Sequence, residues 1–97
     1  MAFSRNRILL VDDDQDTCSA VKLLLNQSGY RVKAVQTPGA ALRLAQCERF
    51  DLFVLDNHLN DGTGLELCRK IRSFDTATPI LIFSGTCAAG TVATGVG

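Results

Sequence analysis

The stretch ILLVDDD, from Ile8 to Asp14, places an uninterrupted apolar run directly before a block of carboxylates. A short aliphatic run bounded by charged residues is typical of a strand that is buried on both faces. Beyond the carboxylates, residues 17–28 place apolar side chains three and four positions apart, and Gly29 follows as a C-terminal stop, which predicts a helix. The chain therefore opens with a buried strand that leads into a helix.

The alternation of strand and helix continues along the chain. Thr37 and Pro38 provide an N-cap and a first-turn proline, and residues 30–35 alternate as a strand at or near a sheet edge would. The predicted strands are 8–11, 30–35, 52–55 and 80–83, and the predicted helices are 17–28, 38–47 and 65–73. This order predicts an α/β fold, a doubly wound parallel sheet with helices on both faces.

Size and charge narrow the class of protein. The 97 residues suffice for one domain with one core. Ten basic residues balance ten acidic ones, which argues against direct binding of nucleic acid. The N-terminus lacks the apolar region of a signal peptide, and the uncharged stretch 76–97 is too rich in glycine and threonine for a membrane span. We therefore expect a cytoplasmic protein without membrane contact.

The cysteines fit the same compartment. No CxxC or CxxH pair is present to start a zinc site. Each cysteine lies in or beside an apolar helical pattern, where a free thiol behaves as a small hydrophobe. These four residues are Cys18, Cys47, Cys68 and Cys87. We interpret them as free thiols in a reducing environment.

Polar side chains that could bind a metal ion or react with a substrate follow three of the predicted strands. Asp12 and Asp13 follow the first strand, Asp56 the third and Ser84 the fourth. Because parallel strands end at one rim, where ligands of open α/β sheets bind, we expect these groups to converge. Converging carboxylates repel one another, and Mg²⁺ with its preference for oxygen ligands would resolve that repulsion. The set suits an aspartyl phosphate, with Asp56 attacking phosphorus and Ser84 donating to a phosphoryl oxygen.

The neighbouring acids have simpler interpretations. Asp14 and Asp16 are predicted to cap the first helix and to favour its N-terminus electrostatically. A calcium-binding EF-hand starting at Asp12 is excluded, because Thr17 stands where that loop needs glycine and Leu23 where it needs glutamate.

Four motifs in register resemble the receiver domain of bacterial response regulators. They are residues 8–14 (ILLVDDD), 50–56 (FDLFVLD), 61–67 (DGTGLEL) and 79–85 (PILIFSG). The resemblance covers roughly the first 87 residues. It implies a flavodoxin-like fold with strand order 2-1-3-4 and a role in two-component phosphorelay signalling.

The resemblance also implies a role for each matching residue. Asp56 corresponds to the phosphoacceptor, Asp12 and Asp13 to the acidic pair, and Ser84 to the switch hydroxyl. His58 corresponds to the position whose backbone carbonyl binds Mg²⁺. The implied donor is a phosphohistidine on a sensor histidine kinase or a histidine phosphotransfer domain. Any catalysis would be limited to the chain's own phosphorylation and dephosphorylation.

The sequence departs from the family pattern in three places. Asn60 replaces the usual proline, Asp14 adds a carboxylate, and no lysine follows Lys70. We expect the chain to lack two elements of the family: the fifth strand, which carries a lysine, and the helix that follows it. We therefore expect residues 1–97 to form one receiver domain that is incomplete at the C-terminus, with 86–97 partly disordered or a frayed helix. The strand at 80–83 would then expose an edge for self-association.

Two alternatives remain open from the sequence. A degenerate receiver could act only as a protein-interaction module, which the missing lysine favours. An aspartate-nucleophile phosphatase would use Asp12 and Asp14 as its motif, but Asp16 stands where that class needs threonine and no catalytic lysine follows.

Overall fold

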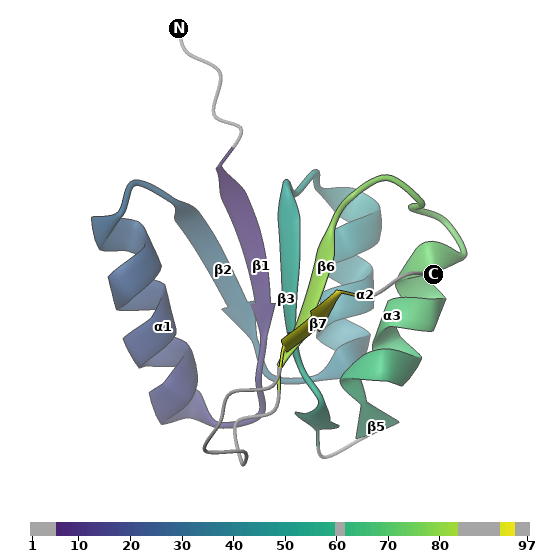
Figure 1. Ribbon diagram of the computed structural model, residues 1–97, viewed down its shortest axis with the longest axis horizontal. Coiled ribbons are helices and arrows are strands. Elements are labelled where there is room, and N and C mark those ends of the chain that lie inside the picture. The colour runs from purple at the N-terminus through teal and green to yellow at the C-terminus, as the bar shows by residue number, and fades with distance from the viewer. Residues whose placement is uncertain (1–5, 60–61, 84–91, 95–97) are drawn as a thin grey trace, which may run out of the picture.

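The computed structural model describes residues 6–59, 62–83 and 92–94. The strands are β1 (Arg7–Val11), β2 (Arg31–Val35), β3 (Leu52–Asp56), β4 (His58–Leu59), β5 (Gly62–Thr63), β6 (Ile80–Phe83) and β7 (Val92–Thr94). The helices are α1 (Gln15–Gln27), α2 (Pro38–Cys47) and α3 (Gly64–Arg72). One sheet has the order β2-β1-β3-β6-β7, and β4 pairs with β5 in a separate two-stranded ribbon (Figure 1).

The four strands predicted from the sequence form the parallel part of this sheet. β1 pairs with β2 on one side and with β3 on the other, and β3 pairs with β6, all in parallel. The predicted order 2-1-3-4 is confirmed, with β6 as its fourth strand. β2 lies at an edge, as its alternating sequence predicted.

Local sequence signals account for the starts of two helices. The Thr37 hydroxyl accepts a hydrogen bond from the Ala40 amide at 3.2 Å, and proline follows at the first helical position, so the predicted start of α2 is confirmed. α3 begins with a capping box, in which the Glu66 amide donates to the Thr63 hydroxyl at 3.1 Å and the Thr63 amide donates to the Glu66 carboxylate at 2.9 Å. The box starts the helix one residue before the predicted range 65–73.

Successive side chains of β1 enter two different layers of the core. Leu9 and Val11 pack in one cluster with buried residues of α2 and α3. Ile8 and Leu10 pack in a second cluster with α1 on the opposite face. Alternation along a strand that is apolar on both faces therefore produces the predicted arrangement of helices on both sides of the sheet.

The face under α1 is the less covered of the two. Cys18 is the one fully buried residue of α1. Leu23 and Leu24 are 59% and 63% exposed. On the sheet below, Val54 and Phe83 pack against this cluster but are only half-buried. Among the described helices, α1 alone packs on this face, where Val21 and Leu25 contact the cluster but remain only partly buried.

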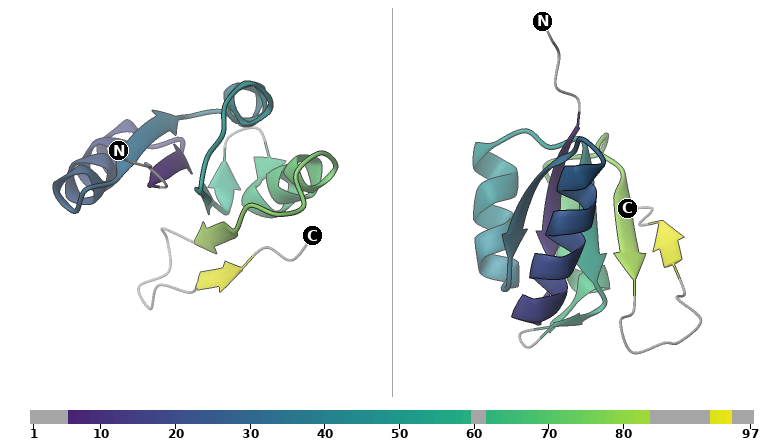
Figure 2. Two further views of the ribbon diagram at one scale, coloured as in Figure 1. Left: turned by 90° about the horizontal axis from the view of Figure 1, so that it is seen from above. Right: turned by 90° about the vertical axis from the view of Figure 1, so that its left-hand side faces the viewer.

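The last described strand differs from our expectation for the C-terminal segment. We expected 86–97 to be partly disordered or a frayed helix, whereas Val92–Thr94 form β7. β7 pairs antiparallel with Leu81–Phe83 and lies beside β6 at the edge of the sheet in both views of Figure 2. Val92 and Thr94 are β-branched, which suits a strand, and antiparallel edge strands on parallel sheets are common. The edge of β6 is therefore paired, and the rest of 86–97 lies outside the described residues.

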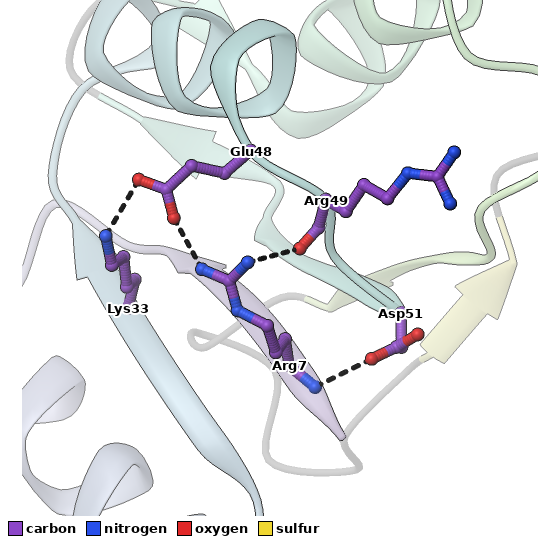
Figure 3. Close-up of polar contacts among 5 residues, drawn as sticks. All are labelled: Arg7, Lys33, Glu48, Arg49 and Asp51. Atoms are coloured by element: carbon purple, nitrogen blue, oxygen red, sulfur yellow. Dashed lines mark hydrogen bonds and ion pairs between the residues drawn. The ribbon is translucent and has the colours of Figure 1, made fainter. Parts of the chain in front are cut away.

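A polar network ties together the amino-terminal end of the sheet (Figure 3). The Arg7 guanidinium binds the Glu48 carboxylate, donates to the Arg49 carbonyl at 2.8 Å, and lies 4.9 Å from the centre of the Phe50 ring. Lys33 lies 2.8 Å from the other oxygen of Glu48. These contacts join β1, β2 and the end of α2.

The described cysteines occupy two environments. Cys18 and Cys68 are buried free thiols in the core, as predicted. Cys47 is exposed at the end of α2, and Cys87 lies outside the described residues. Across the part of the chain that the structure describes, no helix is both long and apolar enough to cross a membrane.

Candidate functional site

Three carboxylates meet at the carboxyl end of the sheet. Asp12 directly follows β1, and Asp56 is the last residue of the neighbouring strand β3. The parallel register pairs Val11 with Leu55, so the next residue of each strand lies at the same rim. Oxygen atoms of Asp12, Asp13 and Asp56 all lie within 4.8 Å of one another. The predicted convergence of these three side chains is thus found in the structure.

Two of the three carboxylates are buried beside one another. Asp12 is 2% exposed and Asp56 is 6% exposed, whereas Asp13 is half-buried. Burial and the neighbouring Asp56 and Asp13 carboxylates together raise the pKa of Asp12 to about 6, against a hydrogen bond from the Asp14 amide that lowers it. Buried carboxylates that repel one another are a suitable ligand set for a divalent cation with hard oxygen preferences.

The turn that carries Asp12 and Asp13 is held from both sides. The Asp12 amide donates to the Val35 carbonyl of β2 at 3.1 Å. The Cys18 thiol of α1 donates to the Asp12 carbonyl, with sulfur and oxygen 3.2 Å apart. Burial raises the pKa of this thiol, so it keeps its proton and remains a donor. The Asp12 carboxylate itself accepts from the Asp14 amide at 2.9 Å.

The acids next to this turn serve the helix, as predicted. Asp14 is the N-cap of α1 and accepts hydrogen bonds from the Asp16 amide at 3.3 Å and the Thr17 hydroxyl at 2.6 Å. The hydrogen bond from Thr17 holds the pKa of Asp14 below its usual value. Asp16 is exposed in the first turn, where its charge favours the helix N-terminus.

The segment after Asp56 is anchored by its backbone. The His58 amide donates to the Asp56 carboxylate at 3.1 Å, and the Asn57 amide donates to the Phe83 carbonyl of β6 at 2.7 Å. The Gly64 amide donates to the Asn57 carbonyl at 3.2 Å. A Cβ atom on Gly64 would lie 2.6 Å from the Asp56 carbonyl oxygen, so only glycine lets the start of α3 approach β3 this closely.

The remaining predicted residues divide into two groups. His58 lies next to Asp56, because its backbone amide donates to the Asp56 carboxylate, and His58 is exposed to solvent. Ser84 and Asn60 lie outside the described residues. The sequence did not predict the hydrogen bond from the Cys18 thiol to the Asp12 carbonyl, because no local pattern indicates it. It also missed the capping box, although the spacing of Thr63 and Glu66 could have revealed it.

Comparison with known proteins assigns this arrangement to a family. A family model described as the response regulator receiver domain matches residues 8–96. The sensor histidine kinase AruS of Pseudomonas aeruginosa is 40% identical over 83 residues, which cover 81% of this chain and 8% of AruS. The chain spans about a third of the length of the response regulators that it matches.

Solved structures give the same result for the fold. A CheY-like receiver domain protein from Methanospirillum hungatei is 32% identical with a TM-score of 0.81, over 88% of this chain and 68% of that one. The response regulator TrrA from Thermotoga maritima, in complex with Mg²⁺ and BeF, is 29% identical with a TM-score of 0.74, over 77% and 65% of the two chains. TrrA in complex with the histidine kinase ThkA matches at 27% identity and a TM-score of 0.79, over 84% and 71%.

Proposed function

Because the chain belongs to the response regulator receiver domain family, we propose that it accepts a phosphoryl group on Asp56 in the presence of Mg²⁺. The observation that carries this proposal is the buried cluster of three carboxylates at the ends of β1 and β3. Asp56 is the member of the cluster that ends a central strand. Its position fits the family's phosphoacceptor.

The proposed ligands of Mg²⁺ are the carboxylates of Asp12, Asp13 and Asp56 and the backbone carbonyl of His58. The donor set fits the ion, because carboxylate oxygens within 4.8 Å of one another can share a hard cation with its waters. When bound, Mg²⁺ would offset the charge on the phosphoryl oxygens.

The hydrogen bonds of Asp56 suggest which of its oxygens reacts. Oδ1 accepts the His58 amide at 3.1 Å, which leaves Oδ2 as the nucleophile. A bond forms between Oδ2 and phosphorus as the bond from phosphorus to the donor histidine nitrogen breaks. We assign the Ser84 hydroxyl the role of donating a hydrogen bond to a phosphoryl oxygen.

The proposed donor is a sensor histidine kinase or a histidine phosphotransfer domain. The neighbour TrrA, which was crystallised with the kinase ThkA, supports a partner of this kind. We place the chain in the cytoplasm, as one receiver domain that binds neither nucleic acid nor membrane directly. We predicted self-association through the edge of the strand at 80–83, but β7 pairs with that edge, so it is not open to a second chain in this way.

Phosphorylation by acetyl phosphate with Mg²⁺, followed by intact mass, tests the proposal. We expect the wild type to gain one phosphoryl group that hydroxylamine removes, and Asp56→Asn to gain none. Asp51→Asn is the matched control, because Asp51 lies at the opposite end of the sheet, where it accepts the Arg7 amide. Equal labelling of Asp56→Asn and wild type would assign the phosphoryl group elsewhere. A folded wild type that takes up no label would favour the protein-interaction module instead.

A further inference from the structure

We infer that Cys18 is a positioning residue for the acidic site. Its thiol fixes the peptide unit between Asp12 and Asp13 so that both carboxylates are presented to the same point. The inference depends on the proposed function only for the use of the site, since the contact itself is a property of the fold.

Cys18 makes two contacts with the acidic turn from the first turn of α1. Its thiol sulfur lies 3.2 Å from the Asp12 carbonyl oxygen, and its amide donates to the Asp14 carbonyl at 3.0 Å. Both partners of the thiol contact are buried, with Cys18 5% exposed and Asp12 2% exposed. Water competes little for a hydrogen bond in such a place.

The geometry of the peptide bond explains why this carbonyl matters. The carbonyl of Asp12 and the amide of Asp13 belong to one rigid plane, which can turn only about ψ of Asp12 and φ of Asp13. A change in either angle that the other does not compensate would swing the two side chains relative to each other, and it would also turn the carbonyl away from its donor. A donor on the carbonyl oxygen resists the turn from the α1 side, while the bond to the Val35 carbonyl holds the Asp12 amide from the β2 side.

The hydrogen bond from Cys18 opposes the repulsion among the three carboxylates. Three carboxylates with oxygens within 4.8 Å push one another apart before a cation binds, and Asp12 and Asp13 share the turn that would yield. A tether on their common peptide unit keeps the ligand set together in the metal-free protein. Preorganisation of this kind is expressed as tighter binding of the cation.

The simpler role of Cys18 is that of a core filler, because it packs with Ile8, Leu10 and Val32. Three substitutions separate the two roles. Cys18→Ser keeps a donor, Cys18→Ala removes it with little change in size from serine, and Cys18→Val restores apolar contact without a donor. Cys68→Ala is the matched control, because Cys68 is 2% exposed but lies in α3 on the other face of the sheet.

The first measurement is the ¹⁵N order parameter of the Asp13 amide without Mg²⁺. We expect wild type, Cys18→Ser and Cys68→Ala to keep a rigid Asp13 amide, and Cys18→Ala and Cys18→Val to lose order there. Equal order in the serine, alanine and valine variants would overturn the inference. The valine variant decides the question if the alanine variant unfolds.

The second measurement is the Kd for Mg²⁺, taken from the shifts of backbone amides during titration. The loss of a weak S–H···O bond predicts about a threefold rise in Kd for Cys18→Ala and Cys18→Val relative to Cys18→Ser. Identical Kd values in the three variants would contradict a positioning role. If Asp13→Ala binds Mg²⁺ as tightly as wild type, the proposed metal site fails, whereas the order of the Asp13 amide still decides the role of Cys18.

Discussion

At the amino-terminal end of the sheet, Glu48 is bound by Arg7 and Lys33, whereas at the carboxyl-terminal end the carboxylates of Asp12 and Asp56 face each other. The hydrogen bonds from Lys33 and Arg7 lower the pKa of Glu48, and burial beside other carboxylates raises the pKa of Asp12 to about 6. The ionised form of a carboxyl group is therefore stabilised at one end of the sheet and destabilised at the other.

The difference indicates what each end does. A carboxylate with cations built in around it holds elements together and has little use for a ligand. Carboxylates gathered without such cations lower the stability of the fold until a cation arrives from solution. Within the described part of the chain, Arg7 and Lys33 pair with Glu48 at the end of the sheet opposite the acidic site.

The largest expected effect breaks the packing beside the acidic end. Gly64→Ala would place a Cβ atom 2.6 Å from the Asp56 carbonyl oxygen and force α3 away from β3. We expect the free energy of unfolding to fall by about 3 kcal/mol, as for a strongly overpacked position. Gly39→Ala is the control, because a Cβ atom there meets nothing within 4 Å, and it should be neutral or slightly stabilising. Urea unfolding measures both, and similar losses would show that the close approach carries no strain.

The next effect uses pH to separate the two ends. The pKa of Asp12 is about 6 in the folded protein and 3.8 ordinarily, so the folded state binds this proton more tightly than the unfolded chain. The free energy of unfolding should therefore rise by about 1.3 kcal/mol as the pH falls from about 7 to about 5, and this gain is lost again as the pH rises through 6. Glu48 stays ionised in that window because its pKa is lowered.

Asp12→Asn sharpens this test. The variant keeps an oxygen acceptor for the Asp14 amide but removes the titrating charge. Its stability should change little between about pH 7 and 5. Urea unfolding without Mg²⁺ at several pH values measures the slopes, and parallel slopes for the variant and wild type would assign the pH dependence to another group.

The third prediction concerns the addition of Mg²⁺ to the acidic site. Mg²⁺ at ten times its Kd should raise the free energy of unfolding by about 1.4 kcal/mol through mass action alone. Asp13→Ala should abolish this gain, whereas Asp16→Ala should keep it, because Asp16 lies outside the cluster. Thermal unfolding with and without Mg²⁺ makes the comparison. A gain that survives in Asp13→Ala would place the ion elsewhere.

The smallest effect is expected at the compensated end. Glu48→Gln removes the charge that pairs with both Arg7 and Lys33; these side chains are partly exposed, and exposed ion pairs contribute little. We expect a slightly lower Tm at low salt and no difference from wild type at high salt. A loss that persists at high salt would mean that hydrogen bonding and the stacking of Arg7 on Phe50 matter more than charge.

Much of the fold could be predicted because its signals are local. The apolar run from Ile8, the N-cap Thr37 and the strand at 80–83 were visible in short windows, and all three are found in the structure. The convergence of Asp12 and Asp56 followed from one further rule, that parallel strands end at a common rim.

The remaining features depend on distance in three dimensions. β7 is a short strand whose pairing with β6 carries no signal in its own sequence. The contact of the Cys18 thiol with the Asp12 carbonyl and the bond between Arg7 and Glu48, 41 positions apart, exist only once helices are placed on the sheet. The spacing of hydrophobic residues gives the face of a helix, but not the atoms that it meets.

The small buried surface of α1 has a consequence for local unfolding. α1 buries Cys18 fully, whereas α3 buries Leu67, Cys68 and Ile71 together with its first glycine. A helix with so little buried surface detaches at a lower free energy than the rest of the domain, so the amides of α1 should exchange with deuterium well before those of α3. Each opening of α1 also withdraws the thiol from the Asp12 carbonyl, so the acidic turn loosens in the same event. A cation at the three carboxylates would therefore slow exchange along a helix that it never touches.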